Sequence, residues 1–277
     1  MELYNDDCIK KMKDLSNNCI DLLFCDLPYG QTSCKWDCLI DLDLFWKEIS
    51  RICKYECPMF FTCSTKFGVS LINSNPKNFR YDLVWVKSSP CGFLNAKKMP
   101  MKKHEMVYVF YKKLPKVYTD NIEEHHTHKF IKETENKRNG KDGVDNKGMI
   151  KNRSEKETVS KYDPPLPTSV IKTEHETAYG NNTHHHCPQQ RNGESIYEPP
   201  LPNSILEIKS EKGKHSTQKP VDLIKWCLKY YSKEGDTILD PTMGSGSTGV
   251  ACKEMNRNFI GIEMDEEIYD IACKRLE

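Results

Sequence analysis

Short apolar runs alternate with stretches of helical spacing towards both ends of the chain. Ile20–Cys25 is short, apolar and bounded by polar residues, which is typical of a buried strand. Leu42–Cys53 instead places its apolar side chains on one helical face. The strands predicted in this way are Ile20–Cys25, Pro58–Cys63, Asp82–Val86, Met106–Tyr111, Thr237–Leu239 and Asn258–Ile262. The predicted helices are Leu42–Cys53, Val221–Tyr231 and Glu266–Leu276.

This alternation favours an α/β fold with a mostly parallel sheet that is covered on both faces. The middle of the chain differs, because residues 113–202 are rich in His, Asn, Lys, Pro and Glu and cannot bury much core by themselves. A segment that begins at Tyr162 recurs 35 residues later at Tyr197, and one pair of copies is too few for a solenoid. We therefore expect one folded domain, 1–112 and 203–277, interrupted by a partly mobile insertion, 113–202.

The composition indicates the cellular compartment in which the protein is expected. The thirteen cysteines have no regular spacing and no secretory leader precedes them, which argues against secretion and a disulfide framework. No apolar run approaches the roughly 18 residues of a membrane span. We expect a soluble protein of a reducing compartment, the cytoplasm. Two pairs of cysteines are four residues apart, Cys34 with Cys38 and Cys53 with Cys57. They lack the tighter spacing typical of zinc sites, so no metal is expected.

Charge is unevenly placed although the net charge is only +1. Residues 97–116 hold seven lysines and a single acid, Glu105. Taken alone, such a run is most simply a solvated face. The lysine run indicates a binding surface for a polyanion only if other segments also point to such a partner.

A glycine-rich turn lies between a predicted strand and a helix, from Asp240 to Gly249. Missing Cβ atoms let a ligand approach the backbone, and the helix start presents free N–H groups. Glu263 ends the next strand, where a carboxylate can accept both hydroxyls of a ribose. From these residues alone, a nucleoside-bearing cofactor and a structural turn both remain open.

Asp26-Leu27-Pro28-Tyr29 resembles the catalytic tetrapeptide, most often Asp-Pro-Pro-Tyr, of S-adenosylmethionine-dependent DNA amino-methyltransferases. The glycine segment resembles their cofactor loop, and residues 217–220 resemble the segment before that loop. The lysine-rich stretch 92–113 resembles a type common among phage and viral adenine enzymes. The resemblance covers about the first 113 and the last 75 residues.

The order of these motifs, with the catalytic tetrapeptide first, matches the circularly permuted class called beta. Such a permutation is tolerated when the chain ends lie close together. The resemblance implies a Rossmann-like class I methyltransferase fold in which the last strand and helix lie beside Met1–Tyr4. For a viral enzyme, the expected location is the site of DNA replication in a host cell.

The resemblance assigns the chemistry as well. Asp26 and the main-chain carbonyl of Leu27 would accept the hydrogens of a target amine, and Pro28 would restrict Leu27 to extended conformations. Tyr29 would stack on a base that has left the duplex. Methyl transfer would then need positioning in line, with no covalent enzyme intermediate.

The implied cofactor is S-adenosylmethionine and the implied partner is DNA. The cofactor-binding residues implied are Asp7, with Asp6 as its neighbour, Thr217, Gln218, Lys219, Pro220, Asp240, Pro241, Thr242, Met243, Gly244, Ser245, Gly246 and Glu263. The lysines expected to contact phosphates are Lys97, Lys98, Lys102 and Lys103. Two residues depart from the pattern: Leu27 replaces a proline, and Thr242 stands where many relatives carry Phe.

The sequence predicts transfer of a methyl group to the N6 amine of adenine in DNA, with the insertion providing much of the target recognition. Transfer to the N4 amine of cytosine stays open, although those enzymes more often carry Ser at the position of Asp26. An RNA target and a nucleic-acid-binding relative without catalysis are further alternatives. Whether the chain forms a homodimer or works beside a restriction nuclease is open as well.

Overall fold

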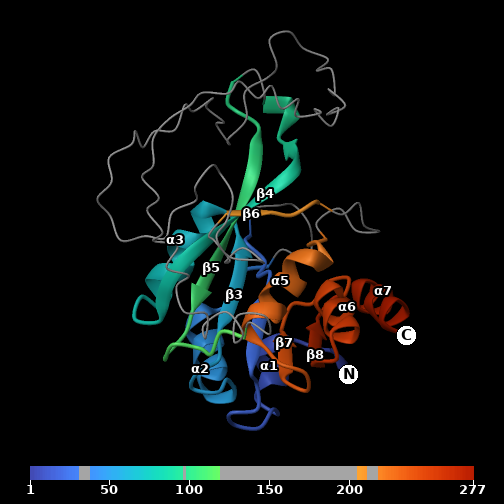
Figure 1. Ribbon diagram of the computed structural model, residues 1–277. Coiled ribbons are helices and arrows are strands. Elements are labelled where there is room, and N and C mark those ends of the chain that lie inside the picture. The colour runs from blue at the N-terminus through green and yellow to red at the C-terminus, as the bar shows by residue number, and fades with distance from the viewer. Residues whose placement is uncertain (31–37, 96–97, 119–204, 211–217) are drawn as a thin grey trace, which may run out of the picture.

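The computed structural model describes residues 1–30, 38–95, 98–118, 205–210 and 218–277. Its strands form one eight-stranded sheet in the order β1-β8-β7-β2-β3-β5-β4-β6 (Figure 1). The strands are β1 Glu2–Asn5, β2 Leu22–Cys25, β3 Met59–Cys63, β4 Phe79–Cys91, β5 Lys102–Phe110, β6 Ile205–Glu207, β7 Thr237–Asp240 and β8 Asn258–Glu263. The helices are α1 Cys8–Met12, α2 Leu42–Ile52, α3 Thr65–Ser74, α5 Val221–Tyr231, α6 Ser247–Glu254 and α7 Glu266–Leu276, with a 3-10 turn at Phe93–Asn95.

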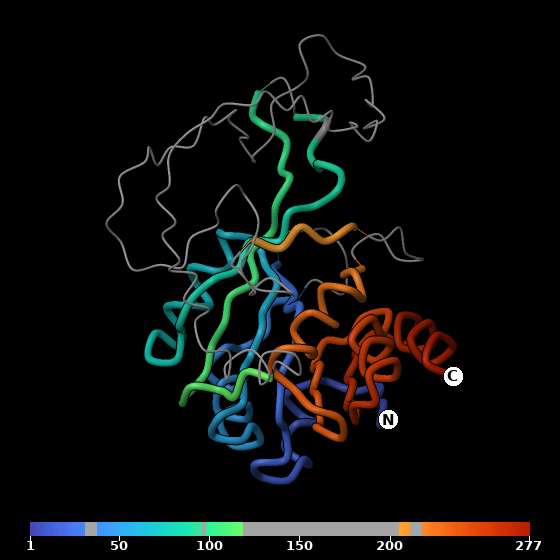
Figure 2. Tube along the Cα trace, in the orientation of Figure 1, coloured from blue at the N-terminus to red at the C-terminus, as the bar shows by residue number. Residues whose placement is uncertain are grey.

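The central strands are buried on both faces, so their apolar residues divide between two cores. In β2, Leu23 and Cys25 pack with α1, α2 and α3, while Leu22 and Phe24 pack with α5, α6 and α7. This division follows from the two-residue period of a strand. The sheet therefore lies between two helical layers (Figure 2).

The sheet is mostly parallel, as the sequence predicts, and β5 is its antiparallel member, paired with β3 and β4. β1 pairs with β8 in parallel, with Tyr4 opposite Ile262. The first and last strands are therefore neighbours, as the resemblance implies, and both chain ends lie on this side of the molecule (Figure 1).

All predicted strands and helices are present. Helices α5 and α7 have the predicted bounds, and the other predicted elements have shifted ends. Asp82–Val86 is the middle of the longer β4, and Met106–Tyr111 overlaps the second half of β5. Helix α3 was not predicted, because Gly68 interrupts its helical pattern. A Cβ at Gly68 would lie 2.2 Å from the ring of Tyr108, so this close packing requires glycine.

In the described ranges, no helix is both long and apolar enough to cross a membrane. Of the predicted insertion, 113–202, only residues 113–118 belong to the described ranges.

Candidate active site

The carboxyl ends of β2 and β7 lie side by side, because these strands pair in parallel. From β2 the chain continues to β3 on one side, and from β7 it continues to β8 on the other. Open α/β sheets bind ligands at such a switch point, outside the carboxyl ends of the strands. Asp26 directly follows β2 and Asp240 ends β7, so the two sequence motifs meet at this point.

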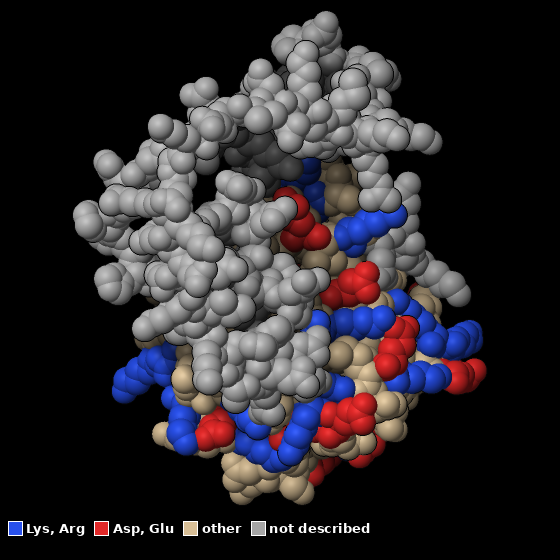
Figure 3. All heavy atoms as spheres, in the orientation of Figure 1, with Lys and Arg blue, Asp and Glu red and all other residues tan. Residues whose placement is uncertain are grey.

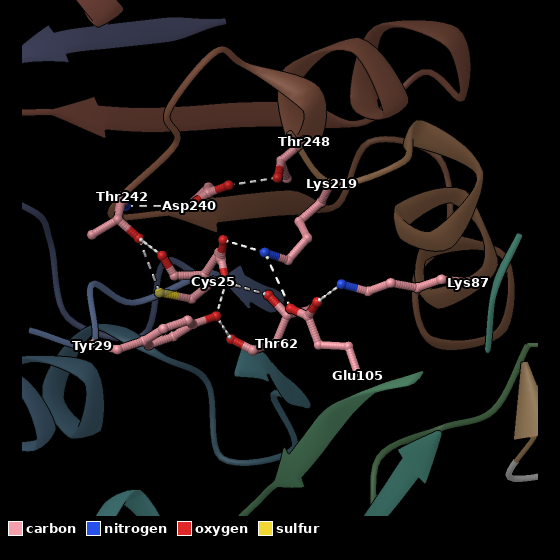
Figure 4. Close-up of polar contacts among 10 residues, drawn as sticks. Cys25, Tyr29, Thr62, Lys87, Glu105, Lys219, Asp240, Thr242 and Thr248 are labelled. Carbon is pink, nitrogen blue, oxygen red and sulfur yellow. Dashed lines mark hydrogen bonds and ion pairs between the residues drawn. The ribbon is translucent and has the colours of Figure 1, made fainter. Parts of the chain in front are cut away.

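Three side chains donate hydrogen bonds to the Asp26 carboxylate. Thr62 Oγ1 lies 2.7 Å and the Tyr29 hydroxyl 2.5 Å from Oδ1. Lys219 Nζ lies 2.5 Å from Oδ2. The donors come from β3, from the segment after β2 and from the segment before α5 (Figure 4). Hydrogen bonds to a carboxylate are strong, so this convergence fixes the orientation of Asp26.

The charged contacts continue from Lys219 into the sheet. Its Nζ lies 3.3 Å from Oε1 of Glu105 in β5, and Oε2 of Glu105 lies 2.6 Å from Nζ of Lys87 in β4 (Figure 4). Because β5 runs antiparallel to β3, its first half reaches the same edge of the sheet as Asp26.

Both members of the Lys219–Glu105 pair keep their charge. Burial alone would lower the pKa of Lys219, but the carboxylates of Asp26 and Glu105 outweigh it and the pKa is raised. Burial alone would raise the pKa of Glu105, but Lys219 and Lys87 outweigh it and the pKa is lowered. The site therefore holds fixed charges of both signs at neutral pH.

Tyr29 has a packed ring and a bonded hydroxyl. Its ring lies 5.3 Å from the ring of Phe67, centroid to centroid, at an angle of 39°. The hydroxyl lies within reach of both Asp26 and the main-chain oxygen of Thr62, and its one proton can serve one of them at a time. Burial, reinforced by the negative charge of Asp26, raises the pKa of Tyr29, so the hydroxyl stays a donor.

Thr242 connects the glycine turn to the catalytic segment. Its Oγ1 lies 3.1 Å from the main-chain oxygen of Asp26 and 3.3 Å from Sγ of Cys25 (Figure 4). A phenylalanine, the residue of many relatives at this position, could make neither contact. The departure noted in the sequence therefore creates a direct link between the two motifs.

Asp240 stabilises the same turn from inside. One carboxylate oxygen accepts from Thr248 Oγ1 at 2.5 Å and the other from the main-chain nitrogen of Thr242 at 3.2 Å. Its side chain is buried, and this burial raises the pKa of Asp240 to about 7.

The turn itself is open towards a ligand. Gly244 and Gly246 have φ of +51° and +80°, conformations that favour glycine. A Cβ at Gly244 would meet no protein atom within 4 Å, whereas one at Gly261 would collide with Met243 Sδ. Space beside the backbone of Gly244 is thus available to a ligand, which fits the cradle expected for a nucleoside cofactor.

Glu263 lies against this turn and burial raises its pKa. Its two oxygens accept from the main-chain nitrogens of Gly244 at 3.0 Å and Asp265 at 2.9 Å. A carboxylate offers roughly four lone-pair positions, so Glu263 keeps acceptor capacity for a ribose hydroxyl. At the end of the neighbouring β1, the main-chain nitrogen of Asp6 bonds the main-chain oxygen of Glu263, and Asp7 caps α1.

Leu27, which is buried, and Pro28 lie in the chain between Asp26 and Tyr29. The other remaining predicted residues divide into two groups. Five flank the contacts above, in the segment before α5 and in the glycine turn: Gln218, Pro220, Pro241, Met243 and Ser245. The other group is the lysines, of which Lys98, Lys102 and Lys103 belong to the β4–β5 hairpin that extends beyond the sheet on the active-site edge (Figure 1). Thr217 and Lys97 lie outside the described residues.

Sequence reasoning missed Thr62, Glu105 and Lys87. Glu105 carried one signal, since it is the only acid in the lysine-rich run. Acidic and basic side chains are interspersed over the described part of the face in Figure 3, so the view itself marks no single-sign surface. Among the described residues, no group of three or more His, Cys, Asp or Glu side chains could hold a metal ion.

A family model for N6/N4 methyltransferases, described as DNA methylase, matches residues 20–274. Two curated relatives share local matches with the chain. The type II methyltransferase M2.DpnII of Streptococcus pneumoniae is 49% identical over 71 residues, 26% of either chain. The type II methyltransferase M.HinfI of Haemophilus influenzae is 40% identical over 93 residues, 33% of this chain and 26% of the relative. The chain thus matches about a quarter of the length of these relatives.

Solved structures match almost the whole chain. The M1.HpyAVI–SAM complex aligns with a TM-score of 0.56 and 21% identity, covering 99% of both chains. PvuII DNA methyltransferase, described as cytosine-N4-specific, aligns with a TM-score of 0.63 and 12% identity over 99% of this chain and 86% of that one. At these identities the likeness establishes the fold.

Proposed function

The chain belongs to the DNA methylase family, and on that premise we propose that it transfers a methyl group from S-adenosylmethionine to the N6 amine of adenine in DNA. One observation carries the proposal. The Asp26 carboxylate and the glycine turn after β7 share one edge of the sheet, and Thr242 bonds the main chain of Asp26 across it. Motifs that lie more than 200 residues apart in sequence are thereby joined.

The chain's contribution to the chemistry is to prepare the amine. An exocyclic amine is a poor nucleophile, because its lone pair is delocalised into the ring. Asp26, and the main-chain carbonyl of Leu27 as the resemblance implies, would hold its hydrogens and favour a pyramidal nitrogen. Asp26 is also placed to accept the proton that the nitrogen loses after methylation.

S-adenosylmethionine supplies a methyl group on a positively charged sulfur. Gly244 and Glu263 would hold its nucleoside part, and Asp7 would lie near its adenine, as the resemblance implies. The two binding sites then have to align nitrogen, methyl carbon and sulfur. The order of the motifs supports the permuted beta arrangement. The described part of the β4–β5 hairpin would carry phosphate-binding lysines, and residues 113–202 would be the target-recognition insertion.

The choice of adenine rests on Asp26, since cytosine enzymes more often carry Ser there. The likeness to a cytosine-N4-specific structure makes cytosine the second candidate. The test is incubation of the protein with unmethylated genomic DNA and labelled S-adenosylmethionine, followed by digestion to nucleosides and mass spectrometry. Formation of N6-methyladenine supports the proposal. Formation of N4-methylcytosine shows that cytosine is the substrate base, and the absence of both products refutes the methyltransferase activity.

Asp26→Asn tests the catalytic assignment. It keeps the size of the side chain but weakens the acceptor, so methylation should fall about a hundredfold or more. Asp82→Asn, at an exposed position of β4, is the matched control and should leave the rate unchanged. Calorimetric titration with S-adenosylmethionine should give heat in all three proteins. A wild type without heat would favour a nucleic-acid-binding relative that lacks catalysis.

A further inference from the structure

The Asp26 carboxylate has little acceptor capacity left. Oδ1 accepts from Thr62 and lies within donor reach of Tyr29, while Oδ2 accepts from the ammonium of Lys219. A carboxylate offers roughly four lone-pair positions, so at most about one remains for a further donor. That position is on Oδ2, so an amine that approaches Asp26 shares this oxygen with the ammonium of Lys219.

The charge of Lys219 also opposes the proposed reaction at this place. The target nitrogen gains positive charge as its bond to the methyl carbon forms. A like charge beside it raises the energy of that step, most strongly in a site shielded from water. Lys219 would thus hinder methyl transfer if it stayed on Oδ2 throughout.

Glu105 offers the ammonium a second position. Its Oε1 lies 3.3 Å from Lys219 Nζ, and its Oε2 is held at 2.6 Å by Lys87. The side chains of Lys219 and Glu105 are 12% and 10% exposed, whereas that of Asp26 is 28% exposed. An incoming group therefore reaches this cluster through Asp26, and a displaced ammonium can move inward to Glu105.

We propose that Lys219 is a positioning residue that alternates between Asp26 and Glu105, leaving Asp26 Oδ2 for the target amine and moving onto Glu105 during methyl transfer. The inference rests on the proposed function and adds to it a role for Glu105, which the sequence motifs do not include. Because the pKa of Glu105 is lowered and that of Lys219 raised, both keep their charges and the exchange needs no proton transfer.

A double-mutant comparison tests the exchange. Glu105→Gln removes the second position and should confine the ammonium to Asp26, so kcat should fall about tenfold while the dissociation constant of S-adenosylmethionine stays within about twofold. Adding Lys219→Met removes the confined charge, so the double variant should be at least about threefold faster than Glu105→Gln alone. Glu56→Gln, which removes the acid of the exposed Lys113–Glu56 pair, is the matched control and should match wild type.

The opposite order of the two rates overturns the proposal. If Lys219 only supported Asp26 statically, the double variant would be as slow as Glu105→Gln or slower. Because Glu105→Gln leaves a buried ammonium with one carboxylate, the melting temperature is measured for each variant. If Glu105→Gln melts well below wild type, Glu105→Asp is used in its place. The aspartate keeps the negative charge, but its side chain is one methylene shorter and its carboxylate lies farther from Lys219. Adding Lys219→Met to Glu105→Asp should again increase the rate.

The wild-type rate separates this inference from the proposed function. A wild type that leaves no methylated base in DNA refutes both. An active wild type together with a double variant no faster than the single one refutes the exchange and leaves the proposed function intact.

Discussion

Lys219 Nζ lies 2.5 Å from Oδ2 of Asp26, although 193 residues separate them in the chain. The segment before α5 therefore reaches the carboxylate that follows β2. The motif around Lys219 was expected to serve the cofactor, and that assignment stays a prediction. What the structure adds is a cation on the proposed catalytic acid, balanced by a second carboxylate in β5.

The hydroxyl and the ring of Tyr29 should have separable roles. Tyr29→Phe keeps the ring against Phe67 but removes the donor to Asp26, so kcat should fall about tenfold, the cost of one hydrogen bond to a charged group. Tyr29→Leu also removes the stacking surface and should raise KM for DNA. Tyr81→Phe, whose hydroxyl pairs with Tyr231 instead, is the control. Equal effects of Tyr29→Phe and Tyr29→Leu on both constants would contradict this division.

Cofactor affinity should depend on the open space beside Gly244. Gly244→Ala places a side chain at φ +51°, and Gly235→Ala does the same at φ +80° on the loop before β7, where a Cβ also meets no protein atom within 4 Å. Each variant should lose about 1 to 2 kcal/mol of unfolding free energy. Only Gly244→Ala should weaken S-adenosylmethionine binding, measured by calorimetry. Equal affinities of the two variants would place the cofactor elsewhere.

The buried Asp240 should make stability fall as pH rises from about 4 to about 7. Burial raises its folded pKa to about 7 from the ordinary 3.8, so in this window the unfolded chain ionises while the folded one stays protonated. The loss reaches at most roughly 4 kcal/mol and is constant above the folded pKa. Asp240→Asn cannot ionise.

Urea unfolding at a series of pH values checks this linkage. The unfolding free energy of Asp240→Asn minus that of wild type should become more positive between about pH 4 and pH 7, whatever constant offset the amide introduces. Asp82→Asn provides the surface control. A difference that stays flat across this window would show that Asp240 is ionised in the folded protein.

The sequence predicted the backbone of the site better than its side-chain contacts. Asp26 was assigned through the family resemblance, and the glycine turn also through its place between a predicted strand and a helix. The fold brings the two together because β2 and β7 pair in parallel, with their carboxyl ends at the same edge. Glu105 and Thr62 were missed, because alternation shows which face a residue occupies but not its partner on another strand. Thr62 reaches Asp26 because β2 and β3 pair in parallel, and Glu105 reaches Lys87 because β4 and β5 pair antiparallel.

Local chemistry explains two further differences. The second half of β4 runs through Ser88, Ser89 and Pro90, which carry no strand pattern, and its recorded pairing with β5 skips from Val86 to Cys91. Thr242 departs from the family pattern noted in the sequence, and its hydroxyl bonds the main chain of Asp26. A residue that departs from a family pattern can thus have a partner that only the fold identifies.

The lysines of the β4–β5 hairpin should determine how steeply DNA affinity falls with salt. Lys98 and Lys102 lie in the hairpin that extends past the active-site edge, whereas Lys77 and Lys233 precede β4 and β7 at the other edge of the sheet. Each lysine that neutralises a phosphate releases about one counterion, so Lys98→Gln with Lys102→Gln should reduce the slope of log affinity against log salt by about two. Lys77→Gln with Lys233→Gln removes the same charge and should leave the slope unchanged. Fluorescence anisotropy with one labelled duplex at several salt concentrations measures both, and equal slopes for the two pairs would mean that net charge, and not the hairpin, determines binding.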